Sequence, residues 1–330
     1  MRLVNVLALT NAQLINDPFV SSFTNIVFEA KSVKRGDLFI AFDEDSIEEA
    51  ILNGAYGIVF DKPTQISDNE IAWIKVKDIE NALKKLLRFK LIEKETLNYS
   101  CDEITLQLAL QINSDSKLII INKDLRTIAQ TLWNIELKSI TLFSKSFQDI
   151  DIFTDINSIP LSNKEYIKIV EKTLFETSFI YDKKYYEREF ISPLFISNLN
   201  NLINLYKILN IDFRLKKFTM LNNFEVTFIN GKFEIKEFGS TDKVLIFEKN
   251  LDLITQEILF LRKNSSWAKT IYILPSSYLC EDDSNIYRYK NTHEIIPLLK
   301  KHFFNFALVV GIDKKIIAQP ITSTQLTLDF

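Results

Sequence analysis

Two histidines and two cysteines are the side chains of this sequence best suited to metal binding or nucleophilic catalysis. His293 and His302 fall on one predicted helix. Their spacing of nine residues makes the two side chains point in directions half a helical turn apart, so we do not expect them to share a metal ion. Cys101 and Cys280 have no Cys or His at ligand spacing, which argues against a zinc site and a disulfide framework. No Gly-x-Ser-x-Gly nucleophile motif occurs. We therefore predict no metal site and assign no catalytic residue.

A lysine at a strand-to-helix junction is a candidate for phosphate contact. The stretch IIINKDLRTIAQ places Lys123 and Asp124 between a predicted strand and a predicted helix. A triphosphate at such a junction needs glycines whose backbone N–H groups face the phosphates, a lysine, and a Ser or Thr for magnesium. No glycine occurs between Gly57 and Gly231, and the Asp124 carboxylate repels an anion. We interpret Lys123 as a solvated residue at a helix start and predict no nucleotide cofactor.

A Lys-Arg-Gly-Asp turn in AKSVKRGDLFIAF, residues 30–42, is a second candidate for ligand contact. Gly36 can supply a positive φ, and Asp37 can bond its own backbone and so start the strand LFIAF. Two interpretations remain open. Either the turn is a scaffold feature, which we favour, or it contacts a ligand through Lys31, Gly36 and Asp37.

Alternating short apolar strands and amphipathic helices predict an α/β fold with three domains. Within residues 1–94, DLFIAF and YGIVFDKP predict strands on either side of the helix SIEEAILNGA, which ends at Asn53-Gly54. AWIKVKD predicts another strand. The helix after it has an apolar face made of Ile79, Leu83, Leu86, Leu87 and Leu91. We interpret the apolar run within residues 1–17 as a strand and not as a signal peptide.

Residues 95–212 are predicted to form a reduced central α/β domain without a phosphate-binding loop. KLIIIN predicts a strand, DLRTIAQTLWNI a helix and SITLFS a second strand. A hairpin is predicted to turn at Asp182-Lys183-Lys184, and Ser192-Pro193 introduces a long helix. Residues 213–330 begin with a hairpin at Asn230-Gly231 and then alternate strands with helices. They predict a small Rossmann-like domain with a mainly parallel sheet and a tail at residues 320–330.

Two phrases near the N-terminus resemble the Mur ligase family, which uses ATP to add amino acids or peptides to UDP-N-acetylmuramate in peptidoglycan synthesis. EAKSVKRGDLFIA is similar to the family phrase Asp-Ser-Arg-x-Val-x-x-Gly-Asp-Leu-Phe-x-Ala, and EEAILNGAYGIVFDKP is similar to E-A-I-x-x-G-A-x-x-V-V. SPLFISNLNNLINLYKILNID is similar to the segment that closes the family's central domain, which adds Asn198 and Asn201 to the ligand-binding candidates. The resemblance covers most of the chain in outline and is nearest to the UDP-N-acetylmuramoyl-tripeptide D-alanyl-D-alanine ligases. It implies the family's order of N-terminal α/β, central α/β and C-terminal Rossmann-like domains.

The chain departs from the family's pattern at the positions that carry its chemistry. The family holds ATP in a Gly-Lys-Thr-Thr loop, which residues 119–130 lack. The triplet Asp-Ser-Arg that helps hold the uridine nucleotide appears as Glu29, Ala30 and Lys31, without the hydroxyl and the planar guanidinium. The acids and the carbamylated lysine that hold magnesium match no position. The resemblance therefore implies a shortened relative without ligase activity.

Composition narrows the classes of partner and the compartment. The formal net charge is -3 and neither half is strongly basic, so we predict no direct binding to nucleic acid. No run reaches the length of a membrane span, and we predict no membrane contact. Scarce cysteines and the lack of a signal-peptide pattern indicate a cytoplasmic protein.

The last six residues, QLTLDF, resemble the bacterial sliding-clamp binding peptide Gln-Leu-x-Leu-x-Phe. Its specified positions are met by Gln325, Leu326, Leu328 and Phe330. A terminal peptide can place Leu and Phe in an apolar groove while Gln makes polar contacts. The same residues could instead add a strand to the last sheet, so the DNA sliding clamp stays one possible partner.

Three functions remain open at this point. The first is a non-catalytic Mur-like scaffold or regulator that binds a UDP-muramyl peptide or a Mur enzyme. The second is a sliding-clamp-associated interaction protein that uses the tail. The third is an active UDP-muramyl-peptide ligase with an unrecognised ATP site. We rank them in this order, because the missing phosphate-binding loop weighs against the third.

Overall fold

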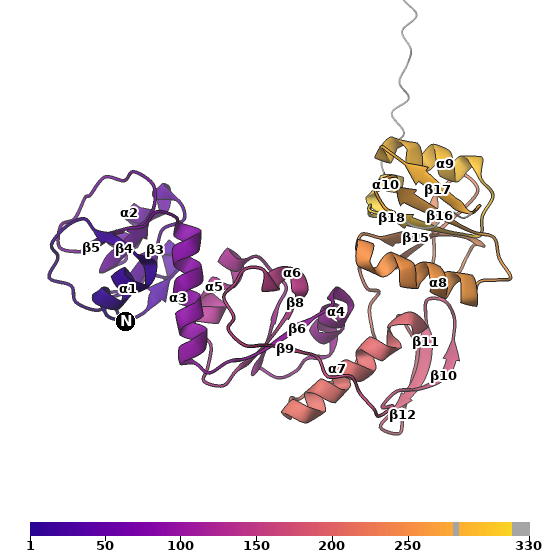
Figure 1. Ribbon diagram of the computed structural model, residues 1–330, viewed down its shortest axis with the longest axis horizontal. Coiled ribbons are helices and arrows are strands. Elements are labelled where there is room, and N and C mark those ends of the chain that lie inside the picture. Colours follow the sequence, from indigo (N-terminus) through magenta and orange to yellow (C-terminus); the bar gives the residue numbers. More distant parts are fainter. Residues whose placement is uncertain (280–283, 319–330) are drawn as a thin grey trace, which may run out of the picture. The chain divides into compact units, whose positions relative to one another are not determined.

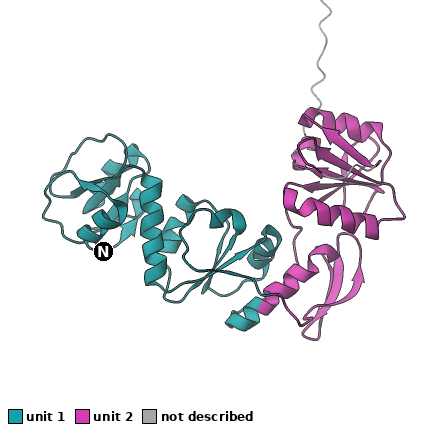
Figure 2. Cartoon of the chain, viewed as in Figure 1, with its two compact units in different colours: residues 1–160, 205–213 teal, residues 161–204, 214–330 magenta. Residues whose placement is uncertain are grey.

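The computed structural model describes residues 1–279 and 284–318, which divide into two compact units (Figures 1 and 2). Unit 1 contains residues 1–160 and 205–213, and unit 2 contains residues 161–204 and the described residues from 214 onward. Helix α7 (Ile196–Leu209) contributes to both units. Both units mix helices with sheets of parallel strands, so the predicted α/β class is confirmed. The domain boundaries at residues 94 and 212 stay a prediction.

The first sheet of unit 1 has the strand order β1-β5-β4-β3-β2, and all its neighbouring strands are parallel except β1 and β5. Its strands are β1 (Gln13–Leu14), β2 (Ile26–Val27), β3 (Leu38–Ile40), β4 (Gly57–Phe60) and β5 (Ala72–Lys75). Its helices are α1 (Leu3–Thr10), α2 (Ile47–Leu52) and α3 (Ile79–Glu93), with 3-10 turns η1 (Ala30–Ser32) and η2 (Glu44–Ser46). Helices α1 and α3 contribute to the core on one face of the sheet, and α2 contributes to the core on the other.

The second sheet of unit 1 has the order β7-β8-β6-β9, and all its strands are parallel. Its strands are β6 (Leu97–Cys101), β7 (Leu118–Ile121), β8 (Ile140–Ser144) and β9 (Ile156–Ser158). Its helices are α4 (Glu103–Ile112), α5 (Leu125–Trp133) and α6 (Lys145–Gln148). Helix α3 packs against both α1 and α5, which joins the two halves of unit 1 into one hydrophobic core (Figure 1).

Unit 2 contains a three-stranded antiparallel sheet and a six-stranded sheet. The smaller sheet is made of β10 (Lys168–Lys172), β11 (Thr177–Tyr181) and β12 (Lys184–Glu189), followed by η3 (Pro193–Phe195) and the first part of α7. The larger sheet has the order β14-β13-β15-β18-β16-β17, with its last four strands parallel. Its strands are β13 (Glu225–Ile229), β14 (Ile235–Lys236), β15 (Lys243–Glu248), β16 (Thr270–Pro275), β17 (Ile286–Tyr289) and β18 (Phe306–Val310). Its helical elements are η4 (Leu251–Leu253), α8 (Ile254–Asn264), η5 (Thr292–Glu294), α9 (Ile295–Lys301) and α10 (Lys315–Ala318).

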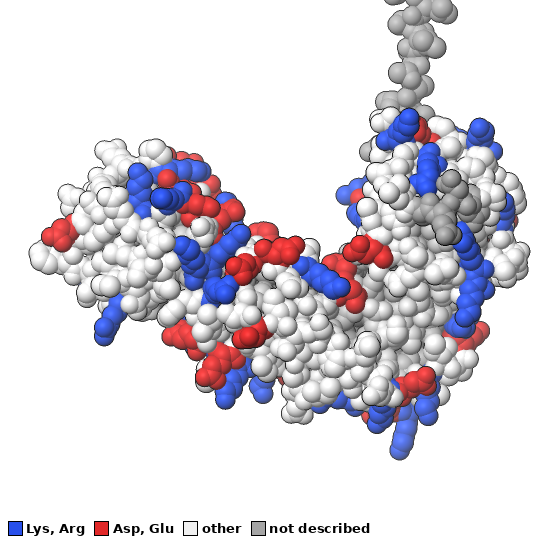
Figure 3. Space-filling model, in the orientation of Figure 1, with Lys and Arg blue, Asp and Glu red and all other residues white. Residues whose placement is uncertain are grey.

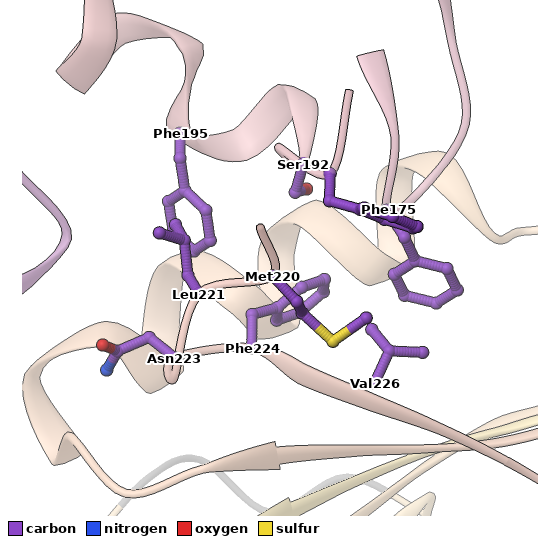
Figure 4. Close-up of a pocket in the computed structure, with 9 residues that line it drawn as sticks. Phe175, Ser192, Phe195, Met220, Leu221, Asn223, Phe224 and Val226 are labelled. Carbon is purple, nitrogen blue, oxygen red and sulfur yellow. The ribbon is translucent and has the colours of Figure 1, made fainter. Parts of the chain in front are cut away.

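Aromatic side chains hold the two sheets of unit 2 together. The ring of Phe175 lies 6.0 Å from Phe224, 6.4 Å from Phe228 and 6.1 Å from Phe306, measured between centroids. Edge-on aromatic pairs of this kind stabilise a packed interface beyond the area they bury. A cavity of about 20 Å³, lined by Phe175, Phe195 and Phe224 among others, lies at this junction and has room for about one water (Figure 4).

The structure confirms most of the predicted elements and corrects one. Residues 1–17 do not form the predicted strand; Leu3–Thr10 is a helix that buries Leu3, Val6 and Thr10. These buried positions follow the helical spacing, which the short apolar run obscured. The hairpin turn at Asp182 and Lys183 is confirmed, with both residues at positive φ between β11 and β12. The strand β6 and the helix α4 after it were missed.

Candidate functional site

The carboxyl edge of the β7-β8-β6-β9 sheet is where an α/β sheet of this kind binds ligands. Both β6 and β7 pair in parallel with β8, so their carboxyl ends lie at the same edge. Three strand-to-helix junctions therefore meet there, β6 to α4, β7 to α5 and β8 to α6, of which the last begins a helix of only four residues. The sequence predicted only the second of them. The β6–α4 junction follows an interior strand of the sheet, so it is a second possible position for a phosphate-binding loop.

The junction between β6 and α4 consists of a single residue, Asp102. Its carboxylate accepts the backbone N–H of Thr105 at 2.8 Å and the Thr105 hydroxyl at 2.9 Å. A phosphate-binding loop would need several residues of open backbone here. The connection is too short for such a loop, and a carboxylate already occupies the helix N-terminus.

The junction between β7 and α5 has the same arrangement. Asp124 accepts the backbone N–H of Thr127 at 3.0 Å and the Thr127 hydroxyl at 2.7 Å. These hydrogen bonds, first of all that of the Thr127 hydroxyl, lower the pKa of Asp124, so its carboxyl is ionised at neutral pH. The neighbouring hollow has a volume of about 280 Å³ and is lined by Asn122, Lys123 and Ser144 among others. Lys123 is exposed beside an anion and not inside a cradle of N–H groups.

The electrostatics of the β6–α4 and β7–α5 junctions disfavour the binding of a polyphosphate. The N-terminus of a helix carries a partial positive charge and free N–H groups, which together attract an anion. Here the side chains of Asp102 and Asp124 take that role from within the chain. A phosphate would have to displace a carboxylate that is covalently held in place. The same arrangement recurs at α3, whose N-cap Asp78 accepts the backbone N–H of Glu80 at 2.9 Å.

The first sheet of unit 1 has its own hollow at its carboxyl edge, of about 280 Å³. Its lining includes Phe28, Glu29, Lys31 and Asp43, so the predicted candidate Lys31 is exposed at a cavity. Glu29 and Asp43 carry negative charge beside it. The hollow therefore has no excess of positive charge for a diphosphate.

Gly36 and Asp37 lie in the turn before β3 and have structural roles. Gly36 has a φ of +97°, and a Cβ on it would come within 2.7 Å of the Thr24 hydroxyl oxygen. Asp37 is buried and accepts the backbone N–H of Lys34 at 2.9 Å. Neither residue lines the Lys31 hollow. The scaffold interpretation accounts for both of them, and a ligand contact by either stays a prediction.

Arg126 connects the two carboxyl edges of unit 1. Its guanidinium lies 4.8 Å from the centre of the Phe42 ring, which lines the Lys31 hollow, and it pairs with Glu80 at 2.8 Å. Lys, Arg, Asp and Glu are intermixed on the face of unit 1 that Figure 3 shows. The combined edge is thus a surface of both signs of charge rather than an anion-binding cleft.

Asn198 and Asn201 lie on the part of α7 that belongs to unit 2. The Asn201 side-chain oxygen accepts the backbone N–H of Ser162 at 2.9 Å. Its neighbour Asn200 accepts the backbone N–H of Tyr166 at 2.7 Å. These bonds attach the segment before β10 to the helix. Ligand binding by Asn198 or Asn201 stays a prediction.

Among the buried carboxyl groups of unit 2, Glu248 and Glu257 were not predicted from the sequence. Glu248, at the end of β15, accepts hydrogen bonds from the Asn223 side chain at 2.8 Å and from the backbone N–H groups of Phe224 at 2.9 Å and Asn250 at 2.6 Å. Glu257 on α8 is fully buried, and neither of its carboxyl oxygens has a hydrogen-bond partner among the described residues. Burial, and then the charge of Glu248, raise the pKa of Glu257 to about 11.

A sequence signal for Glu257 did exist. It lies on the stripe that buries Ile254, Ile258 and Leu261, at the spacing of one helix face. A charged residue at an apolar position of an amphipathic helix indicates a buried titratable group. With its pKa raised this far, the Glu257 carboxyl is protonated at neutral pH.

Three further observations concern metal binding, membrane spans and the C-terminal peptide. Within residues 1–279 and 284–318, no group of three His, Cys, Asp or Glu side chains could hold a metal ion. No helix in that part of the chain has both the length and the apolar character to cross a membrane. The candidate clamp-binding residues Gln325, Leu326, Leu328 and Phe330 lie outside the described residues.

Comparisons with known proteins bear on the fold. No protein-family model matches the sequence, and no curated protein matches it. Among solved structures, MurF from Acinetobacter baumannii superposes with a TM-score of 0.50 at 9% identity, over 96% of this chain and 98% of that one. MurF ligase from Thermotoga maritima in complex with ADP gives a TM-score of 0.47 at 12% identity, over 89% and 95% of the two chains. The chain has a Mur ligase-like fold.

Proposed function

We propose that this protein is a non-catalytic Mur-ligase-like protein that acts as a scaffold or regulator linked to peptidoglycan precursor synthesis. The observation that carries the non-catalytic part is the pair of carboxylate N-caps, Asp102 and Asp124, at the N-termini of α4 and α5 on the carboxyl edge. The link to the precursor pathway rests on the fold and on the two N-terminal phrases, which is an argument by analogy. The partners that fit this function are a UDP-muramyl peptide or a Mur enzyme.

Phosphoryl transfer is almost entirely a matter of positioning and neutralising phosphate charge. The positive groups that line the three hollows at the carboxyl edge of unit 1 are Lys31, Lys84, Lys123 and Arg126. Arg126 is already paired with Glu80, and Lys123 adjoins Asp124. No backbone cradle supplements them. A chain with this edge would lack the means to stabilise the charge that builds up during transfer of a γ-phosphate.

A direct test supplies the purified full chain with ATP, magnesium, UDP-muramyl tripeptide and D-alanyl-D-alanine, and measures phosphate release. The expected rate equals that of the reaction without protein. Release of phosphate that depends on the muramyl peptide would overturn the proposal and establish the ligase alternative. A second arm adds the chain to an active Mur ligase and measures the rate of that enzyme, which a regulator changes.

The sliding-clamp alternative is favoured by one observation, the terminal sequence QLTLDF. Its test compares binding of the full chain and of a chain ending at residue 324 to the bacterial clamp. Binding that is lost with Gln325, Leu326, Leu328 and Phe330 would move the clamp function ahead of the scaffold function. Equal binding, or none, would remove it.

A further inference from the structure

A second hollow of unit 1 lies at the opposite, amino edge of the first sheet. It has a volume of about 830 Å³ and is lined by residues that directly precede three parallel strands, among them Arg35 before β3, Gly54 and Tyr56 before β4, and Ile71 before β5. Pockets that bind small molecules span about 300 to 1,000 Å³, so this volume admits a ligand of several residues. Neither Lys31 nor the phosphate-site candidates line it.

Two glycine turns meet beside this hollow, and they contribute Arg35 and Gly54 to its lining. The backbone N–H of Gly36 donates to the carbonyl of Gly54 at 3.1 Å, and both glycines have φ near +95°. A Cβ on Gly54 would lie 3.1 Å from the Arg35 Cα, so a side chain there would push the two turns apart. Their close approach brings the Arg35 Nε to 3.2 Å from the Tyr56 hydroxyl, to which it donates. The Lys-Arg-Gly-Asp turn thus positions Arg35 at the hollow.

Asn16 holds together two segments that contribute residues to the lining of the hollow. The Asn16 side chain donates to the carbonyls of Asn69 at 3.0 Å and Ile71 at 2.7 Å, and accepts the backbone N–H of Trp73 at 3.0 Å. It ties the segment that continues into Phe19 to the segment that carries Asp68 and Glu70. The buried Trp73 adds a bond from its indole N–H to the Asp68 carbonyl at 2.6 Å. A site held in this way does not have to be ordered by its ligand.

Opposite charges line the hollow without pairing. Arg35 carries the positive charge, and Asp68 and Glu70 carry negative charges. No carboxylate lies within ion-pair distance of Arg35 in the described chain, and none of the cations described there pairs with Asp68 or Glu70. Phe19 is fully exposed at the same hollow, which is unusual for a phenylalanine, and Ile51 and Ile71 add apolar surface.

We propose that the hollow binds a short peptide in zwitterionic form, with its carboxylate on Arg35, its ammonium group near Asp68 and Glu70, and its apolar side chains against Phe19 and Ile71. An anion alone would meet two carboxylates, and a cation alone would meet the Arg35 guanidinium. A neutral ligand would cover charged groups without pairing them, which costs free energy. Only a ligand with both charges satisfies the whole lining. This proposal is independent of the non-catalytic function.

The test uses the tripeptide Ala-Leu-Ala and the same peptide with an acetylated N-terminus and an amidated C-terminus. Binding to the isotope-labelled full chain is followed by NMR at the amides of Gly36, Gly54 and Tyr56. We expect shifts with the free tripeptide at millimolar concentration, and binding of the blocked peptide weaker by about tenfold or more, as for the loss of two exposed charge contacts. Equal binding of both peptides, or no shift with the free one up to about 20 mM, overturns the proposal.

Matched variants separate this hollow from the rest of unit 1. Arg35→Gln and Glu70→Gln are each expected to weaken the free tripeptide several-fold, while Lys31→Gln at the other edge leaves its affinity unchanged. Among the described residues the exposed Glu70 side chain has no hydrogen-bond or ion-pair partner, so Glu70→Gln tests the charge without a folding defect. Loss of binding in Lys31→Gln alone would place the ligand at the carboxyl edge and overturn the assignment. ATP binding, which tests the proposed function, does not affect any of these outcomes.

Discussion

Asp102 and Thr105 are joined by two hydrogen bonds, from the backbone N–H and from the hydroxyl of the threonine to the two oxygens of one carboxylate. Asp124 and Thr127 repeat this pair one junction further along the chain. Each carboxylate satisfies N–H groups that an α-helix leaves free at its start. In a fold of this class, those N–H groups are the ones that a phosphate would otherwise use. At the starts of α4 and α5, these N–H groups therefore have a structural role and are not open to a phosphate.

Replacement of these caps is expected to cost stability. Asp102→Ala should lower the free energy of unfolding by about 1 kcal/mol, as for other N-cap residues, and the exposed Asp124→Ala should lower it as well. Asp17→Ala is the matched control, because Asp17 is exposed and its side chain has no partner in the part of the chain that the structure describes. Urea unfolding followed by circular dichroism measures the difference. Variants as stable as the control would show that the caps are dispensable.

Replacement of Gly36 is expected to disturb the first sheet. Gly36→Ala places a Cβ within 2.7 Å of the Thr24 hydroxyl oxygen and forces an L residue to a φ of +97°. We expect a loss of more than about 1 kcal/mol in the free energy of unfolding. Gly231→Ala is the control, since a Cβ there meets nothing within 4 Å. The two melting temperatures measure the difference, and equal values would contradict the role given to the turn.

The buried Glu257 should make stability depend on pH. Its pKa is raised to about 11 in the folded chain, against 4.5 for an ordinary glutamate. Its contribution is therefore most favourable below pH 4.5 and is lost as pH rises from 4.5 towards 11, by about 1.4 kcal/mol per pH unit at most. Glu257→Gln removes this dependence, so its advantage over the native chain should be larger at pH 8 than at pH 5. Denaturant unfolding at both values tests this, and identical pH slopes would refute it.

Removal of the Tyr206 hydroxyl is expected to stabilise the protein, unlike the replacement of the caps or of Gly36. Tyr206 is buried in unit 1, and its hydroxyl has no hydrogen-bond partner within the described residues. An unsatisfied buried hydroxyl costs about 1 to 3 kcal/mol. Tyr206→Phe should therefore raise the free energy of unfolding, whereas Tyr166→Phe, which removes a hydroxyl bonded to Asn204, should lower it. A destabilised Tyr206→Phe variant would indicate that the hydroxyl has a partner.

The sequence could predict the elements with strong periodicity but not all of those that build the site. The α3 face was readable because five apolar residues recur at helical spacing, and they are buried in the structure. The β6 strand was missed because Asn98 and Ser100 interrupt its apolar pattern, although Asn98 is buried through a bond from Thr141 at 2.9 Å. Without β6, the junction at Asp102 could not be seen. The amino-edge hollow could not be predicted from the sequence, because it is lined by residues as far apart along the chain as Phe19, Arg35 and Glu70.

Calorimetric titration of the full chain with ATP and magnesium tests the central claim most directly. With carboxylates at the N-termini of α4 and α5 and no glycine between residues 57 and 231, we expect no saturable heat at millimolar nucleotide. Saturable binding, accompanied by NMR shifts at the amides of Thr105 or Thr127, would mean that a phosphate displaces a capping carboxylate. That result would contradict the non-catalytic interpretation of the carboxyl edge.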